Sequence, residues 1–260
     1  MNTILFSQIW ELGMNVWREA VRDKAVQIIV ASGIMLMFFS LVLGRMAVGG
    51  EERVLQSTGF WILGIWGLVS VIYMGSNIVR REIQSKTVYM VLSRPVNRTV
   101  FMFGKFFGML MVLFSAFCIL GICWLILLKL KMIPVSSTHF WALLFIFGEW
   151  VMLAAFSLFF ASFTTPLLHN FFLAGISFLG HWLGDLRMFA ENSRELWLKY
   201  ILRTIYHILP NLEALNFRAD ALYSRVPEPG LLAEGCLVLS GWTLAALIAA
   251  NIIFARRRLL

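Results

Sequence analysis

The chain alternates long apolar runs with shorter polar segments. Six runs with almost no charged residue cover 25–43, 59–79, 106–128, 140–161, 167–184 and 235–254. A hydrocarbon core about 30 Å thick needs roughly 20 apolar residues per helix, so these runs have the length of membrane spans. They lack the strict apolar–polar alternation of transmembrane β-strands. The pattern predicts an all-α integral membrane protein with six transmembrane helices in one domain, residues 1–260. The fifth run is the shortest, and Pro166 separates it from the fourth.

Composition agrees with this pattern and narrows the function. Hydrophobic residues make up 60% of the chain and charged residues 14%, with a mean hydropathy of +0.81. Six spans leave no room for a separate soluble catalytic domain. A phosphate-binding P-loop requires G-x-x-x-x-G-K-[ST], but Gly104-Lys105 is followed by Phe106. The chain is therefore not expected to be an enzyme by itself, and it carries no P-loop for ATP.

Positive charge is distributed unequally between the two predicted sides of the membrane. The side with both termini holds twelve of the 22 lysines and arginines and four acidic residues. Its net charge is therefore +8, the same as that of the whole chain. By the positive-inside rule this side is cytoplasmic. We expect a multi-pass protein of a prokaryotic cytoplasmic (inner) membrane with both termini inside. The excess of basic residues on this side indicates the topology of the chain and contact with anionic lipid. No nucleic-acid partner is expected.

Two amphipathic segments flank the spans. Residues 1–24 carry apolar residues at helical spacing, including Trp10 and Trp17, with charged residues opposite, which predicts a helix at the membrane surface. Residues 185–230 form a mixed-charge outer loop. In this loop, Asn192 to Glu195 read as a capping box before an apolar stripe that Pro210 ends, and a second short helix is expected over 212–223. This loop is interpreted as a lid or collar.

The segment 80–98, between the second and third spans, is the most informative part of the sequence. Ile83, Thr87 and Met90 share one helix face, and Glu82 precedes Lys86 by four residues, the favourable order for an ion pair on a helix. Pro95 disfavours helical geometry at Arg94 and so ends the helix. A short amphipathic helix in water, joined to two membrane helices, can transmit a mechanical push.

At these residues the chain resembles the permease subunits of ABC transporters of the ABC-2 type, particularly the branch linked to the maturation of multicopper enzymes and nitrous-oxide reductase. Permeases of that branch show after their second span a pattern matched here by Glu82, Lys86-Thr87, Leu92-Ser93-Arg94-Pro95-Val96, Arg98 and Gly104-Lys105. Met90-Val91 stands where paired leucines are more usual. Similar motifs continue in the same order, at residues 162–166, at Gly180-His181 and at residues 209–213. The resemblance covers nearly the whole chain.

The resemblance implies a role for each of these segments. The helix around Glu82 to Ser93 would be a coupling helix that docks on a separate nucleotide-binding ATPase subunit, through Glu82, Lys86, Thr87, Leu92, Ser93, Arg94, Pro95 and Arg98. The N-terminal helix would be the elbow helix, whose Arg18, Arg22 and Lys24 touch the same subunit. ATP and magnesium would bind to that partner, so this chain needs no cofactor. A second permease chain, identical or different, is expected, and the direction of transport is outward.

Inside the membrane the sequence offers few chemical groups. Glu149 lies near the middle of the fourth span, where an ionised carboxylate costs about 3 kcal/mol. It belongs either to a substrate path or proton relay, or to a structural contact in which it is protonated or hydrogen-bonded to Asn77 or Ser70. His181 and Asp185 are four residues apart and are expected on one helix face. Two ligands do not make a metal site, so none is expected.

Two other classes of function are weighed against the transporter. An ATP-independent carrier or channel would be expected to have broken helices and several polar residues at the bilayer midplane, and Glu149 is alone there. An intramembrane enzyme would need paired acids or histidines within the bilayer. Glu149 with His169 and His181 near opposite ends of another span does not supply that pair.

Overall fold

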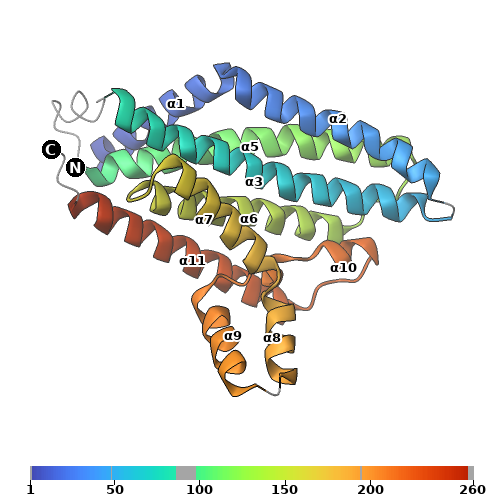
Figure 1. Ribbon diagram of the computed structural model, residues 1–260. Helices are drawn as coiled ribbons and strands as arrows, with labels where there is room; N and C mark the ends of the chain where they lie inside the picture. Colours follow the sequence, from blue (N-terminus) through green and yellow to red (C-terminus); the bar gives the residue numbers. More distant parts are fainter. Residues whose placement is uncertain (1, 48, 86–97, 194, 257–260) are drawn as a thin grey trace.

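The computed structural model describes residues 2–47, 49–85, 98–193 and 195–256, and in these residues the protein is helical without strands. The helices of the main bundle are α1 (Asn2–Arg22), α2 (Lys24–Met46), α3 (Glu51–Ser85), α5 (Arg98–Leu130), α6 (Ser137–Ala161), α7 (Pro166–His181) and α11 (Pro229–Arg256) (Figure 1). Between α7 and α11 lie α8 (Leu183–Asn192), α9 (Leu196–Ile208), the 3-10 helix η1 (Leu212–Leu215) and α10 (Arg218–Leu222).

Five helices, α2, α3, α5, α6 and α11, are long and apolar enough to cross a membrane. They coincide with five of the six predicted spans, so the chain is a multi-pass helical membrane protein. The predicted fifth span corresponds to α7, which has 16 residues and a length of about 24 Å at 1.5 Å per residue. Its predicted end at residue 184 falls beyond a break in the helix at Trp182.

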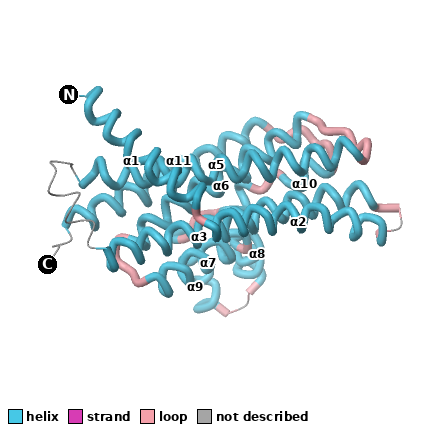
Figure 2. The backbone as a smooth tube through the Cα atoms, turned by 90° about the horizontal axis from the view of Figure 1, so that it is seen from above, coloured by secondary structure: helices cyan, strands magenta, loops and turns pink. Residues whose placement is uncertain are grey.

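The bundle has two distinct ends. The first described residues of α1, the last of α3, the first of α5 and the last of α11 all lie at one end, which we call the basic end (Figure 1). The short connections from α2 to α3 and from α5 to α6 lie at the other end. Viewed from above, the long helices still run side by side between these two ends (Figure 2).

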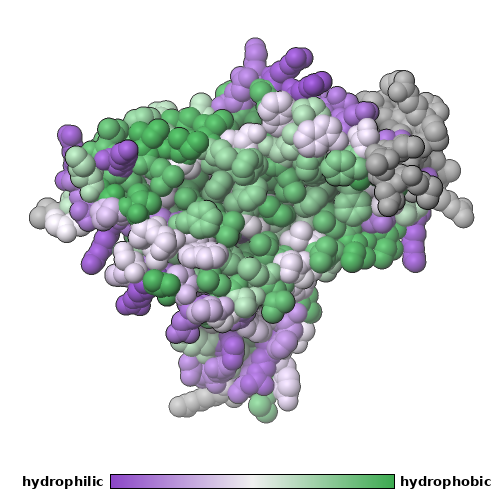
Figure 3. All heavy atoms as spheres, turned by 180° about the vertical axis from the view of Figure 1, so that it is seen from behind, coloured by the Kyte–Doolittle hydropathy of each residue, from purple (hydrophilic) through white to green (hydrophobic). Residues whose placement is uncertain are grey.

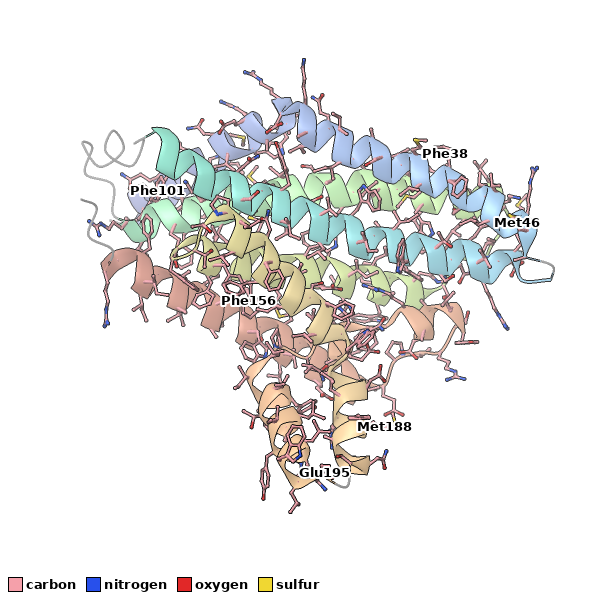
Figure 4. The ribbon with its side chains drawn as sticks, in the orientation of Figure 1. Phe38, Met46, Phe101, Phe156, Met188 and Glu195 are labelled. Atoms are coloured by element: carbon pink, nitrogen blue, oxygen red, sulfur yellow. The ribbon has the colours of Figure 1, made fainter. Side chains whose placement is uncertain are left out.

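The core is centred on α6. Of the most apolar 18 residues of α6, 72% are buried, compared with 17% in the corresponding stretches of α2 and α11. Side chains on the outward side of α2, such as Phe38 and Met46, are exposed, whereas Phe156 of α6 points into the bundle (Figure 4). The resulting apolar surface forms a broad band along the bundle, and hydrophilic residues gather at its ends and on the α8–α9 hairpin (Figure 3). A band of this kind is what a bilayer covers.

Glycines of α3 allow large side chains of the neighbouring helices to approach its backbone. A Cβ atom at Gly59 would collide with the ring of Trp124 from α5, and one at Gly67 with the ring of Trp150 from α6. Both rings are almost fully buried, at 1% and 0% exposed. Because any larger residue would push these rings out, the glycines set the spacing of α3 from α5 and α6.

The segment between α7 and α11 divides into two parts. Leu212, Leu215 and Phe217 of the η1–α10 part are buried in the main core. The α8–α9 hairpin instead projects sideways, carrying Met188 and Glu195 away from the bundle (Figure 4). The helix expected over 212–223 is interrupted at residues 216–217, because Phe217 turns inward onto Phe145, with ring centroids 4.5 Å apart.

Candidate functional site

The predicted coupling segment leaves and re-enters the bundle at the basic end. Glu82 lies within α3, which continues without a break from Glu51 to Ser85, so the helix that carries Glu82 is an extension of the second span. Lys86, Thr87, Leu92, Ser93, Arg94 and Pro95 lie outside the described residues. Arg98 begins α5 and donates a hydrogen bond of 3.0 Å from a guanidinium nitrogen to the carbonyl oxygen of Ala255 in α11. The start of α5 is therefore fastened to the end of α11.

The predicted elbow helix is α1, and its junction with α2 is built around Asp23. One carboxylate oxygen of Asp23 accepts a hydrogen bond of 2.9 Å from the backbone N–H of Ala25 and caps α2. The other accepts one of 2.9 Å from the hydroxyl of Tyr73 on α3. The side chains of Arg18, Arg22 and Lys24 are exposed around this junction. The three cations are thus displayed on a corner that is held by hydrogen bonds to two helices.

Small residues bring α1 into close contact with α5. A Cβ atom at Gly108 would lie 2.6 Å from Cβ of Val16 and 2.8 Å from the carbonyl oxygen of Gly13. Farther along, the indole N–H of Trp17 donates a hydrogen bond of 3.1 Å to the hydroxyl of Ser115. The helix predicted to lie at the membrane surface, α1, therefore packs along α5 as far as Ser115.

Glu149 lies at the centre of a cluster of three ionisable side chains. Its side chain is only 5% exposed, and its Oε2 atom lies 3.1 Å from a terminal guanidinium nitrogen of Arg218 on α10. Its Oε1 atom lies 3.5 Å from Nε2 of His181 at the end of α7, an ion-pair contact without hydrogen-bond geometry. The other ring nitrogen of His181, Nδ1, donates a hydrogen bond of 2.8 Å to the carbonyl oxygen of Ser177. The cluster joins α6, α7 and α10.

The partners of Glu149 differ from those expected from the sequence. The hydroxyl of Ser70 donates to the carbonyl oxygen of Trp66 in its own helix, 2.6 Å away. Asn77 lines a small cleft beside the elbow with Asp23 and Lys105. Neither residue contacts Glu149, because both lie on α3 at positions nearer to the basic end.

Sequence reasoning missed Arg218. It lies 69 residues beyond Glu149 in a segment predicted to form an outer helix, so nothing in the local pattern connects the two. The structure shows that Gly64 on α3 leaves room for the guanidinium group. A Cβ atom there would lie 2.8 Å from Arg218.

The pairing of His181 with Asp185 on one helix face is wrong. The helix α7 ends at His181, Trp182 adopts φ −98° and ψ 2°, and α8 starts at Leu183 in a new direction. Asp185 therefore lies on a different helix from His181. Within the described residues, no group of three His, Cys, Asp or Glu side chains is placed to hold a metal ion.

A lateral cleft of about 640 Å³ adjoins the cluster of Glu149, His181 and Arg218. Residues of α3 and α7 form its walls, and these three ionisable side chains lie along it. The aromatic residues that line it are Trp61, Phe171, Phe178 and Trp182, and each is more than half exposed. A large apolar cleft with a few convergent polar groups is the usual form of a small-molecule site.

A second polar group is buried between α6 and α7. The hydroxyl of Ser157 and Nε2 of His169 are 3.0 Å apart, and Nδ1 of His169 lies 3.1 Å from Oδ1 of Asn170. The order Ser, His, Asn has the form of a nucleophile, a base and an orienting group. However, Ser157 and His169 are both 0% exposed and lie against the bare backbone of Gly75 on α3. A substrate has no access to this hydroxyl, so the group serves to hold three helices together.

The chain matches no protein-family model and no curated protein.

Proposed function

We propose that this protein is the membrane-spanning permease subunit of an ATP-driven transporter of the ABC-2 type. The observation that carries the proposal is the convergence of four chain segments at the basic end: the start of α1, the end of α3, the start of α5 and the end of α11 (Figure 1). The segment with the coupling motif is attached exclusively at this end, between Ser85 and Arg98. The exposed cations of the elbow, Arg18, Arg22 and Lys24, belong to the same half of the molecule.

The proposed orientation places the basic end in the cytoplasm, as the positive-inside rule favours. With the basic end in the cytoplasm, α2, α5 and α7 run outward and α3, α6 and α11 run inward, which makes six crossings with both termini inside. The short α7 then serves as the fifth crossing. Because six is an even number, the coupling segment and both termini meet on the cytoplasmic side of a prokaryotic inner membrane.

In the proposed assembly the chain is one of two permease subunits, each bound to an ATPase subunit that supplies the nucleotide site with ATP and magnesium. Closure of the two ATPase subunits pushes on the segment around Glu82 to Arg94. Because α3 is continuous to Ser85 and Arg98 is bonded to Ala255, a push there moves α3, α5 and α11 together. Export is the direction implied by the family resemblance.

Charge reversal in the predicted coupling segment, compared with charge reversal at the opposite end of α3, tests this proposal. The chain is co-expressed with candidate nucleotide-binding ATPase subunits, and co-purification and stimulated ATP hydrolysis are measured. We expect Glu82→Lys and Arg94→Glu to abolish stimulation. Glu52→Lys, in the first turn of the same helix at the opposite end, is the matched control and is expected to retain it.

The alternatives give different results. An ATP-independent carrier or channel keeps its transport activity in the purified chain without ATPase and is indifferent to Glu82→Lys. An intramembrane enzyme requires an accessible nucleophile, which the buried Ser157 is not. If no ATPase co-purified with the chain under any condition, the proposal would be contradicted.

A further inference from the structure

The lateral cleft between α3 and α7 has the dimensions and lining of a ligand site. Its volume of about 640 Å³ falls within the range of roughly 300–1,000 Å³ that is typical of small-molecule sites. On the α7 side, Gly175 leaves the wall open, because a Cβ atom there would have no neighbour within 4 Å. The space available at Gly175 makes it possible to fill the cleft by substitution without moving a neighbouring helix.

The two kinds of lining point to an amphipathic molecule. Trp61 and Phe171 are 59% and 73% exposed, and with Phe178 and Trp182 they offer apolar ring surface to a ligand. The ionisable groups Glu149, His181 and Arg218 form the polar part of the lining. A ligand that uses both parts must have an apolar body and a polar head.

The hydrogen-bond donors that remain free in the cluster indicate the charge of the ligand's polar head. Both carboxylate oxygens of Glu149 are already engaged, one by Arg218 and the other by His181. A guanidinium group has five N–H donors, and the contacts of the described residues give Arg218 one side-chain hydrogen bond, to Glu149. The site therefore offers N–H donors to a ligand, while a cationic head would find the carboxylate occupied.

We propose that this cleft binds an amphipathic molecule with an anionic head, a carboxylate or a phosphate. The head lies against Arg218, and the apolar chain lies along the aromatic residues of α3 and α7. The proposal concerns binding and does not depend on the ATPase pairing proposed above, because it rests on the cleft alone.

Photo-crosslinking of a fatty acid tests the proposal directly. The full chain is reconstituted in phosphatidylcholine vesicles with palmitic acid that carries a diazirine near its methyl end, irradiated, and digested for peptide mass spectrometry. We expect labels to concentrate on peptides that contain residues 61–68 and 171–182. Oleate should compete for these labels, whereas oleylamine, which has the same chain and a cationic head, and inorganic phosphate, which has no chain, should not.

Two kinds of variant separate the polar head from the apolar chain. Gly175→Leu fills the cleft and should remove the concentrated labelling, and Gly241→Leu on α11, where a Cβ atom likewise meets nothing within 4 Å, is the matched control that should keep it. Arg218→Gln should weaken competition by oleate, about tenfold for the loss of one charge-assisted hydrogen bond. The Gly175 variant leaves the ionisable cluster intact, so the test does not depend on whether the Arg218 variant folds.

Three outcomes would overturn the proposal. Labels spread evenly over all lipid-facing helices, and unchanged by Gly175→Leu, would mean that only annular lipid was captured. Equal competition by oleylamine and oleate would remove the assignment of an anionic head. Competition by inorganic phosphate alone would assign the polar groups to a free anion.

Discussion

Arg218 and Glu149 form an ion pair between α10 and α6, with a nitrogen–oxygen distance of 3.1 Å. The carboxylate is almost fully buried and the guanidinium group largely so, with 5% and 21% of their side chains exposed. The pair fastens the outer segment to the most deeply buried helix of the bundle. Because His181 approaches the same carboxylate, the end of α7 is held at this point as well.

Removal of Arg218 alone is expected to destabilise the protein more than removal of the whole pair. Arg218→Gln leaves the carboxylate of Glu149 buried beside His181 only, and breaking a buried pair in this way costs about 3–5 kcal/mol. The double variant Glu149→Gln, Arg218→Gln leaves no unpaired charge and should recover most of that loss. Thermal unfolding of the purified chain in detergent measures both. Equal losses in the single and double variants would show that the pair is not coupled.

The role of Glu149 in transport can be tested separately from its role in stability. Glu149→Gln retains the size of the side chain, so a structural role predicts nearly normal transport and ATPase stimulation in the protein that folds. A substrate path or proton relay predicts loss of transport with normal folding. Transport assays on reconstituted protein, normalised to folded chain, distinguish the two.

Gly75 is expected to be intolerant of alanine. A Cβ atom there would collide with the hydroxyl of Ser157 and lie 2.5 Å from Nε2 of His169, so α3 would have to move away from α6 and α7. We expect a loss of about 1–3 kcal/mol, as for other overpacked sites. Gly175→Ala is the control, because its Cβ atom meets nothing and alanine favours helix over glycine by about 1 kcal/mol. Unfolding midpoints should move in opposite directions, and a shift of the same sign in both would contradict the packing described.

The contact between α1 and α5 should fail when Gly108 is enlarged. In Gly108→Val the added atoms meet the backbone of Gly13, which cannot rotate away as a flexible side chain could. We expect faster amide hydrogen exchange throughout α1, with α6 unaffected. Gly121→Val, on the same helix with nothing within 4 Å of its Cβ atom, should leave the exchange of α1 unchanged. If the ATPase pairing is correct, Gly108→Val should also weaken ATPase stimulation.

The buried Ser157 should not react with an active-site probe. Its hydroxyl lies beside His169 in a hydrolase-like arrangement, but neither residue is exposed. A fluorophosphonate probe is therefore expected to leave the folded chain unlabelled. Labelling that disappears in Ser157→Ala would instead support an intramembrane enzyme.

Six crossings predict that the α8–α9 hairpin and the end of α3 lie on opposite sides of the membrane. In a chain whose three cysteines are replaced by serine or alanine, Tyr200→Cys should react with a membrane-impermeant maleimide added to spheroplasts, since Tyr200 is 69% exposed. Ser85→Cys should react only after permeabilisation. Reaction of both cysteines only after permeabilisation would mean that α7 does not cross.

The positions of the long helices could be predicted from the sequence because burial in lipid requires uninterrupted apolar runs. The ends of α2 and α6 follow those runs to within three residues, whereas α3 extends past its run at both ends, and α5 and α11 begin eight and six residues before theirs. The helix α1 could also be predicted, since apolar residues recur at helical spacing over residues 1–24.

The contacts between distant segments could not be predicted in the same way. Apolar residues continue past His181, so the sequence pattern did not indicate the break in the helix at Trp182. The pairing of Glu149 with Arg218 depends on where η1 turns, and that is decided by the burial of Leu212 and Leu215 in the core. Information of this kind lies in tertiary packing and not in any local window.

The separation of Glu149 from Arg218 along the chain also has a consequence for biogenesis. Ribosomes deliver α6 to the insertion machinery before α10 exists, and at about 5–20 residues per second the missing 69 residues take roughly 3–14 s to synthesise. During that interval the nascent fourth span carries a carboxylate without its cation, and at about 3 kcal/mol the unpaired acid opposes release into lipid. Stable integration of α6 would then wait for the late-translated part of the polypeptide. Truncations that end before residue 218 should accumulate as substrates of membrane quality-control proteases.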